Sequence, residues 1–390
     1  MSYDAVVMGL GSSGSSVLYH LVRKGFGKVL GIDARCPGCG QTSRSSAIVR
    51  LHYTNPVTRD MAIYSWRFWM RFREETGYER EVYHVTGVGF AGSGGDTKYV
   101  EEVVRSLRSR GIDAEIIPPD KFKLEYFPEI NVDDIDVVAW EPLSGYCDAY
   151  DSVQGFIKYA VTGGAEVRYP EEIIRLEAEG DTILKIVTNK GVYKADYFIN
   201  TLGVWTNKVL RTIGVTLPIQ PAREDVLYIS MDNPPGFGWG DLNLGFYGRP
   251  DTGSRYLIGG LEPDYKVEAS NVEPGEYSTP PLEILRSRLE RASIRFPSMA
   301  SAAPISMIYG YYDVTPDHQP IISIDPRYKN LIHLVGLSGH GFKLAPAFGD
   351  TVTDIILYGE SRRFPLEQFR ATRFREGVDA SGRYKYGILG

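Results

Sequence analysis

The chain has 390 residues, of which 43% are hydrophobic and 24% charged, and this predicts a water-soluble globular protein with room for two or more domains. Its net charge of −6 argues against a general nucleic-acid binder, and its three cysteines are too few for a disulfide framework. Because the N-terminus is unlike a signal peptide and no apolar run reaches membrane-spanning length, we expect a cytoplasmic protein, with peripheral attachment to a membrane electron-transfer chain left open.

The first predicted element is a short apolar strand over residues 4–8, which leads into a glycine-rich turn and a helix. Gly9, Gly11 and Gly14 have the spacing G-x-G-x-x-G, and Asp33 ends the next predicted strand. In this pattern the first glycine allows a tight turn, the second lets a pyrophosphate approach, and the third lets the helix pack on the strand. The acidic residue accepts hydrogen bonds from a ribose. The pattern predicts a dinucleotide-binding unit without distinguishing NAD from FAD.

Cys36 and Cys39 follow this unit as a C-x-x-C pair. Three interpretations are open: a redox dithiol, half of a zinc site, or a turn that carries two thiols and that would form a local disulfide in a thermophile. No second C-x-x-C or nearby H-x-x-H completes a zinc set, so we expect no metal site and favour the turn.

The middle of the chain alternates between helical and strand patterns. An aromatic-rich helix over 60–75 has a stripe that we expect in the core, formed by Met61, Tyr64, Phe68, Trp69 and Phe72. We then expect, in order, a strand over 85–91, a helix over 99–110, turn-rich and β-prone pieces over 112–147, a helix end and strand over 163–168, and a meander over 173–200.

The last part of the chain is rich in β-branched and aromatic residues over 215–325, which predicts a large antiparallel sheet. A final strand over 331–336 leads into a helix with Pro346 near its first turn. We therefore predict a mixed α/β protein in which a Rossmann-like nucleotide domain (1–85, 148–210 and 325–390) is interleaved with a β-rich substrate domain (86–147 and 211–324). A simple NAD dehydrogenase would have a more continuous nucleotide domain.

Several motifs occur in the order of a known family. They are Gly9–Gly14, Thr42-Ser-Arg-Ser-Ser-Ala-Ile-Val-Arg50-Leu-His-Tyr53, Ser144-Gly-Tyr-Cys-Asp148, Ala195–Trp205, Thr315-Pro-Asp317 and Leu337-Ser-Gly-His-Gly-Phe-Lys343. With these motifs the chain resembles the D-amino-acid-oxidase-like FAD-dependent oxidoreductases. The similarity is to their sarcosine oxidase, glycine oxidase and L-proline dehydrogenase (beta subunit-like) branch, and it covers nearly the whole chain.

The resemblance implies that FAD is the cofactor. The residues it assigns to FAD binding are Gly9, Gly11, Ser12, Ser13, Gly14, Asp33, Ala34, Arg35, Ser43, Arg44, Ser45, Val167, Thr201, Leu202, Gly203, Trp205, Gly310, Gly339, His340, Gly341, Phe342 and Lys343. The early glycines and serines would hold the pyrophosphate, Asp33 and Arg35 the adenosine end, and the backbone of Val167 the adenine. The N–H groups around His340 would face the flavin edge where negative charge accumulates on reduction.

The resemblance also implies an amino-acid substrate whose carboxylate is held by Arg50 and Lys343 over the flavin. Tyr247 and, less closely, Tyr53 match tyrosines of the substrate pocket. This arrangement would place the substrate C–H near flavin N5 for hydride transfer, giving an imine that water hydrolyses. Together these features indicate oxidation of a secondary or N-methyl amino acid of the L-proline or sarcosine type.

Two positions depart from the sarcosine oxidase pattern. Gly310 stands where those enzymes link FAD through a cysteine, and Arg44 stands near the histidine that makes the link in related enzymes, so we expect non-covalent FAD. Leu257 stands where they have a lysine associated with oxygen activation, and Lys266 lies too far along the chain to replace it. We therefore expect a dehydrogenase that passes electrons to a quinone, a dye-like acceptor or a partner subunit.

Alternatives remain at this point. The protein could be an oxidase that releases hydrogen peroxide, or a flavin electron-transfer subunit of a larger complex. A thiol–disulfide oxidoreductase built on Cys36 and Cys39 is a further reading, and a hydroxy-acid or glycerol-phosphate oxidoreductase fits the C-terminal motifs less well. The sequence leaves the exact substrate, the acceptor, and the choice between a monomer and a homo- or hetero-oligomer open.

Overall fold

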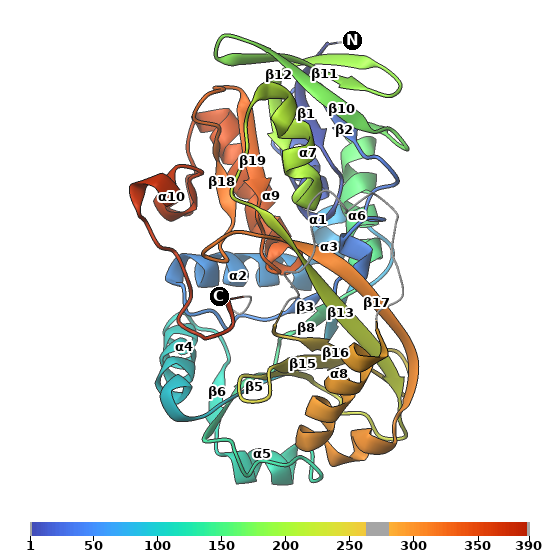
Figure 1. The fold of residues 1–390 in the computed structure, drawn as a ribbon, viewed down its shortest axis with the longest axis vertical. Helices are drawn as coiled ribbons and strands as arrows, with labels where there is room; N and C mark the ends of the chain where they lie inside the picture. Colours follow the sequence, from blue (N-terminus) through green and yellow to red (C-terminus); the bar gives the residue numbers. More distant parts are fainter. Residues whose placement is uncertain (1, 263–280, 388–390) are drawn as a thin grey trace.

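The computed structural model describes residues 2–262 and 281–387, so Lys266 lies outside the described residues. Within them the chain forms two eight-stranded sheets and a three-stranded one, with the first sheet in the upper half of Figure 1 and the second in the lower half. The strands of the first sheet are β1 (Ser2–Met8), β2 (Val29–Ile32), β9 (Glu166–Arg168), β10 (Ile173–Glu179), β11 (Thr182–Thr188), β12 (Val192–Asn200), β18 (Ile321–Ile324) and β19 (Leu331–Val335). Five of its strands run parallel in the spatial order β19, β12, β1, β2 and β9, with β9 at the edge.

Both faces of the first sheet are covered, which explains the nearly continuous apolar run of β1. Ala5 and Val7 face the side covered by α1 (Ser12–Arg23), α6 (Ala149–Thr162) and α9 (Gly341–Tyr358). Val6 and Met8 face the side covered by α7 (Thr206–Leu210) and the β10–β11 hairpin. Parallel strands buried on both faces are typical of a nucleotide-binding sheet.

The second sheet is largely antiparallel, with one parallel pair between β14 and β5. Its strands in spatial order are β17 (Ala303–Val314), β13 (Gln220–Ser230), β16 (Arg255–Gly260), β15 (Phe246–Pro250), β14 (Gly238–Asp241), β5 (Val88–Gly92), β7 (Val137–Glu141) and β6 (Glu115–Ile117). The helices α4 (Thr97–Ser109), α5 (Pro119–Glu125) and α8 (Leu282–Arg295) lie beside it, while α10 (Arg373–Glu376) lies near the first sheet (Figure 1). The long strands β13 and β17 run diagonally from one sheet region to the other.

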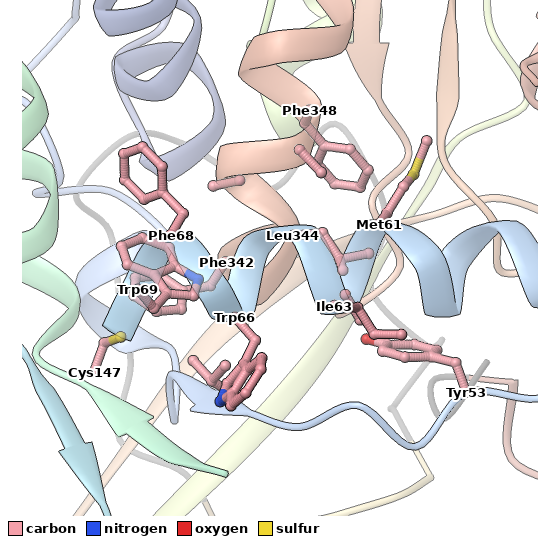
Figure 2. Close-up of a cluster of buried hydrophobic side chains, with 14 of the residues drawn as sticks. Tyr53, Met61, Ile63, Trp66, Phe68, Trp69, Cys147, Phe342, Leu344 and Phe348 are labelled. Carbon is pink, nitrogen blue, oxygen red and sulfur yellow. The ribbon is translucent and has the colours of Figure 1, made fainter. Parts of the chain in front are cut away.

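The three-stranded sheet, β3 (Ile48–Val49), β8 (Gly145–Cys147) and β4 (Tyr83–Val85), joins the two regions beside α2 (Pro56–Met70) and α3 (Phe72–Thr76). Figure 2 shows α2 crossing the first turns of α9, with Trp69 stacked on Phe342 at a centroid distance of 5.3 Å. The predicted aromatic stripe is core, as expected: Met61, Phe68, Trp69 and Phe72 are buried, and the half-buried Tyr64 packs against them. Asn55 caps α2 by accepting from the N–H groups of Val57 and Thr58, so the helix begins earlier than the sequence pattern indicated.

The mixed α/β fold is as predicted, but several local details differ. The helix expected over 60–75 is two helices, α2 and α3, and the helix α5 lies within the segment 112–147 that was expected to hold turns and β-prone pieces. The strand expected over 85–91 is two strands, β4 and β5, which belong to different sheets. The helix α8 lies within the region that the sequence pattern assigned to strands. The strand β18 pairs with β19 in the first sheet, although the domain division placed residues 321–324 with the second. The division into two interleaved domains stays a prediction.

No helix within residues 2–262 or 281–387 is long and apolar enough to cross a membrane.

Candidate functional site

The turn between β1 and α1 is built by its three glycines. Gly9 has a φ of +95°, and a Cβ there would lie 2.8 Å from Thr201 O. A Cβ on Gly14 would lie 1.9 Å from Gly9 O, so only glycine lets α1 approach the turn this closely. A Cβ on Gly11 would meet only Thr42 Oγ1, at 3.1 Å, which leaves the backbone open on the side where a pyrophosphate would lie.

A cavity of about 210 Å³, called here the long cavity, begins at this turn and ends near the start of α9. The predicted cofactor residues that line it are Gly9, Gly11, Ser12, Ser13, Gly14, Asp33, Ala34, Arg35, Arg44, Ser45, Thr201, Leu202, Gly203, Trp205, Gly310, Gly339, Gly341 and Phe342. Ser43, Val167, His340 and Lys343 are not among its lining residues. The sequence reasoning missed other lining residues, among them Gln41, Thr42, Glu171, Glu224, Tyr311, Tyr312 and Asp313.

Asp33 lies where β2 ends, beside the turn. Its Oδ2 accepts from Leu10 N at 2.8 Å and its Oδ1 from Arg35 N at 2.9 Å, and burial raises the pKa of this carboxyl. Each carboxylate oxygen has a further lone pair, so the side chain can still accept from a ligand hydroxyl.

The far end of the long cavity is formed by the start of α9. Ser338 and Gly339 both have positive φ, +50° and +86°, which turns the chain sharply into the helix. Pro346 interrupts the first turns of the helix, and α2 supports the backbone there: Trp69 Nε1 donates to Lys343 O at 2.9 Å, and Ala347 N donates to Ser65 Oγ at 3.1 Å. The helix start is thus fixed against α2, with its N–H groups at the cavity wall.

A second, smaller cavity of about 60 Å³, called here the side cavity, shares Tyr312 and Gly339 with the long cavity. Arg50, Lys343 and Tyr247, three of the four predicted substrate residues, line it together, while Tyr53 does not. Lys343 Nζ donates to Gly339 O at 3.2 Å. Burial, and then the nearby Arg50, lower the pKa of Lys343 well below its usual value. The charge of Arg50, together with an amine of Lys343 that can take up a proton, favours an anionic ligand in this buried cavity.

Tyr53 lies beneath Arg50 rather than in the cavity wall. The Arg50 guanidinium is 4.2 Å from the centre of the Tyr53 ring, a cation–π distance. Tyr53 Oη lies 3.3 Å from His340 Nδ1, and His340 Nε2 lies 3.1 Å from the carbonyl oxygen of His318. Burial lowers the pKa of His340, so a neutral ring that donates through Nε2 and accepts through Nδ1 satisfies both contacts. Tyr53 and His340 therefore position Arg50 and the start of α9.

A second layer of buried polar groups lies behind Arg50. Its guanidinium donates to the carbonyl oxygen of His52, whose Nε2 lies 2.7 Å from Tyr384 Oη near the C-terminus. Glu141 Oε2 accepts from Leu51 N at 2.9 Å and from Ser144 Oγ at 2.6 Å. These residues come from three distant segments, and no motif in the sequence connects them.

Comparison with known proteins agrees with this geometry. Residues 4–355 match the family model DAO, described as FAD dependent oxidoreductase. The chain belongs to this family. It is 26% identical over 377 residues to monomeric sarcosine oxidase of Bacillus sp. (strain B-0618), covering 92% of this chain and 93% of that one. It is also 26% identical over 393 residues to N-methyl-L-tryptophan oxidase of Salmonella typhi, covering 96% and 100%.

Solved structures show the same fold. L-proline dehydrogenase from P. horikoshii superposes with a TM-score of 0.88 at 23% identity, covering 97% of this chain and 99% of that one. Glycine oxidase from Geobacillus kaustophilus superposes with a TM-score of 0.81 at 19% identity, covering 95% and 99%. The resemblance predicted from the motifs is thus confirmed.

FAD is the cofactor of this family, and the long cavity fits it. The open backbone at Gly11 and the start of α1 would hold the pyrophosphate, Asp33 the ribose, and the start of α9 the flavin edge. Gly310 lines the cavity where the resemblance places a linking cysteine. Cys36 and Cys39 are joined in a disulfide and Cys147 is buried, so none of the three presents a thiol to the cavity. Non-covalent binding stays a prediction.

The disulfide also bears on the C-x-x-C pair. Since both sulfurs are bonded to each other, the half-zinc interpretation does not describe this state. The turn with a local disulfide and the oxidised form of a redox dithiol both do. The residues that follow, Gly40, Gln41 and Thr42, line the long cavity. The disulfide therefore lies at the start of the loop 40–42, which lines the long cavity beside the turn between β1 and α1.

Proposed function

We propose that this protein is an FAD-dependent amino-acid dehydrogenase that oxidises the C–N bond of a secondary or N-methyl amino acid, of the L-proline or sarcosine type, to an imine. The observation that carries the proposal is the side cavity, where Arg50 and Lys343 lie next to the long cavity. The names of its relatives, which include sarcosine and N-methyl-L-tryptophan oxidases, support an N-substituted amino acid as substrate.

The residues divide the work between binding and orientation. Arg50 offers a planar fork and Lys343 a point charge, and together they would fix a carboxylate in one orientation. The bound FAD supplies the hydride acceptor. Anchoring the carboxylate beside Tyr312 and Gly339, which both cavities share, would place the substrate carbon at the junction of the cavities. The apolar side chains of Phe90, Trp239 and Leu261 would exclude water around it.

The test is the bleaching of the flavin absorbance by amino acids without oxygen. We expect wild-type protein to be bleached by L-proline or sarcosine within a screen of L-, D- and N-methyl amino acids. Arg50→Ala should retain its yellow colour and lose reduction by at least about 100-fold, because a charged hydrogen-bond partner of the carboxylate is worth about 3 kcal/mol. Arg67→Ala, on an exposed part of α2, is the matched control. Reduction of Arg50→Ala at the wild-type rate would refute the carboxylate role.

A further inference from the structure

Glu224 is a buried carboxyl in the wall of the long cavity that the proposed reaction does not yet use. It is 3% exposed and lies on β13. Its Oε1 accepts from Gly260 N at 2.8 Å and lies 3.9 Å from Arg288 Nη2 on α8. Its Oε2 is buried and has no hydrogen-bond partner among the described residues. A carboxylate with one hydrogen bond and one distant cation is poorly compensated for its loss of hydration.

The strand register places this carboxyl at the flavin end of the long cavity. Glu224 pairs with Gly310 across β13 and β17, and Val226, two residues further on, also lines the cavity. Burial raises the pKa of Tyr247 and Tyr312, which line the side cavity, and the Glu224 carboxyl adds to this effect at both. Glu224 is therefore close to the junction of the two cavities.

The groups that face Glu224 differ in their ability to change charge. Tyr247 and Tyr312 stay neutral because burial raises their pKa, and the Arg288 guanidinium stays charged. Asp225, the next residue, has its own partner, since its Oδ1 lies 3.4 Å from Arg223 Nε. Burial raises the pKa of Glu224 to about 8, with Arg288 acting in the opposite direction. Of these groups, Glu224 is thus the one able to exchange a proton near pH 8. Burial raises the pKa of Asp313, a carboxyl on β17 in the same cavity, only to about 6.

The proton that Glu224 can bind would balance the negative charge that the flavin gains on reduction. A hydride carries two electrons and one proton, so the flavin gains one negative charge on reduction. In a buried cavity that charge raises the proton affinity of a neighbouring carboxyl. We propose that Glu224 binds one proton at Oε2 when the flavin in the long cavity is reduced and releases it when the flavin is reoxidised. An O–H bond forms at the carboxylate with a proton from water or from the substrate amine, and no further electrons are involved.

This inference deepens the proposed function and rests on it for the source of the hydride, but its test needs no amino acid. The FAD-loaded full chain is photoreduced without oxygen from about pH 6 to about pH 10 in weak buffer, and an indicator dye counts the protons bound per two electrons. Above about pH 8 the wild type should take up nearly one proton more than Glu224→Gln, and at lower pH the two should agree because the carboxyl is already protonated.

Two variants make the result specific. Glu171→Gln removes a buried carboxyl from the other end of the long cavity, where it accepts from Thr188 Oγ1 and Tyr193 Oη, and it should keep the extra proton. Glu224→Asp should also keep it, at a shifted pH, and it serves if Glu224→Gln fails to fold. Equal proton uptake by wild type and Glu224→Gln, or a wild type with no rise in uptake with pH, would overturn the inference. Normal proton uptake without bleaching by any amino acid would instead refute the proposed function.

Discussion

Arg50 and Lys343 lie in one small buried cavity. Charging both side chains there is unfavourable in free energy when the cavity holds no anion. Burial and the positive charge of Arg50 both favour the neutral amine of Lys343, which lowers its pKa well below the usual value. A bound carboxylate reverses the second effect because it favours the ammonium form. Ligand binding and protonation of Lys343 are therefore coupled.

This coupling predicts a pH dependence with a definite sign. Below the pKa of Lys343 in the free enzyme, the affinity for a simple carboxylate such as acetate should not change with pH. Above that pKa, binding must take up a proton, so the Kd should rise about tenfold per pH unit. Titration of the flavin spectrum with acetate at several pH values measures this.

Lys343→Met provides the comparison for this prediction. It should bind acetate more weakly than wild type and lose the pH dependence in the range where Lys343 titrates. A Kd for wild type that is constant over the whole range in which the protein is folded would mean that Lys343 does not contact the carboxylate.

At the scale of elements, the turn between β1 and α1 shows how one glycine can decide cofactor binding. A Cβ on Gly14 would lie 1.9 Å from the carbonyl oxygen of Gly9, which is backbone and cannot rotate away. Gly14→Ala must therefore push α1 away from the turn that holds the pyrophosphate. We expect a loss of FAD affinity of at least about tenfold and a destabilisation of about 1–3 kcal/mol.

The measurement is FAD content after gel filtration together with denaturant unfolding. Gly95→Ala is the control, because a Cβ there would meet no atom within 4 Å. If Gly14→Ala retained FAD like the control, helix packing at the turn would not limit cofactor binding.

Elements with a strong local signal were the ones the sequence predicted well. The unit from β1 to β2 combines apolar strands with three glycines, and α9 combines an apolar face with an unusual start at Gly339. The helix α8 was missed although Leu285, Leu289 and Ala292 have helical spacing, because the segments around it are rich in β-forming residues. The segment itself is rich in helix-forming Leu, Glu, Arg and Ala, so the composition of the wider region outweighed the correct local signal in the prediction.

At the scale of the whole molecule, the long and side cavities exist because segments far apart in sequence meet between the two sheets. The long cavity takes residues from α1, β13, β17 and α9, and the long strands β13 and β17 reach across both regions (Figure 1). The resemblance placed Arg50, Tyr247 and Lys343 in one site because Arg50 and Lys343 lie in motifs and Tyr247 matches a pocket tyrosine of the family. Glu224 and Tyr312 were missed because their approach depends on the register of β13 against β17 and β16.

The residue at position 257 affects which acceptor receives electrons from the reduced flavin. Leu257 is fully buried and packs in the same apolar cluster as Val226 and Tyr247, which line the two cavities. The resemblance places a lysine at this position, and a cation there would stabilise the negative charge that develops on oxygen. Leucine gives no such stabilisation.

We therefore expect the reduced enzyme to transfer electrons to an artificial dye at least about tenfold faster than to oxygen, a difference of about 1.4 kcal/mol in barrier. Stopped-flow reoxidation with dye or with dissolved oxygen measures both rates on one preparation. Leu257→Lys should raise the oxygen rate and leave the dye rate nearly unchanged, because only the oxygen reaction gains from the added cation. If that variant does not fold, the wild-type ratio alone decides: equal rates with dye and oxygen would show that the protein is an oxidase despite Leu257.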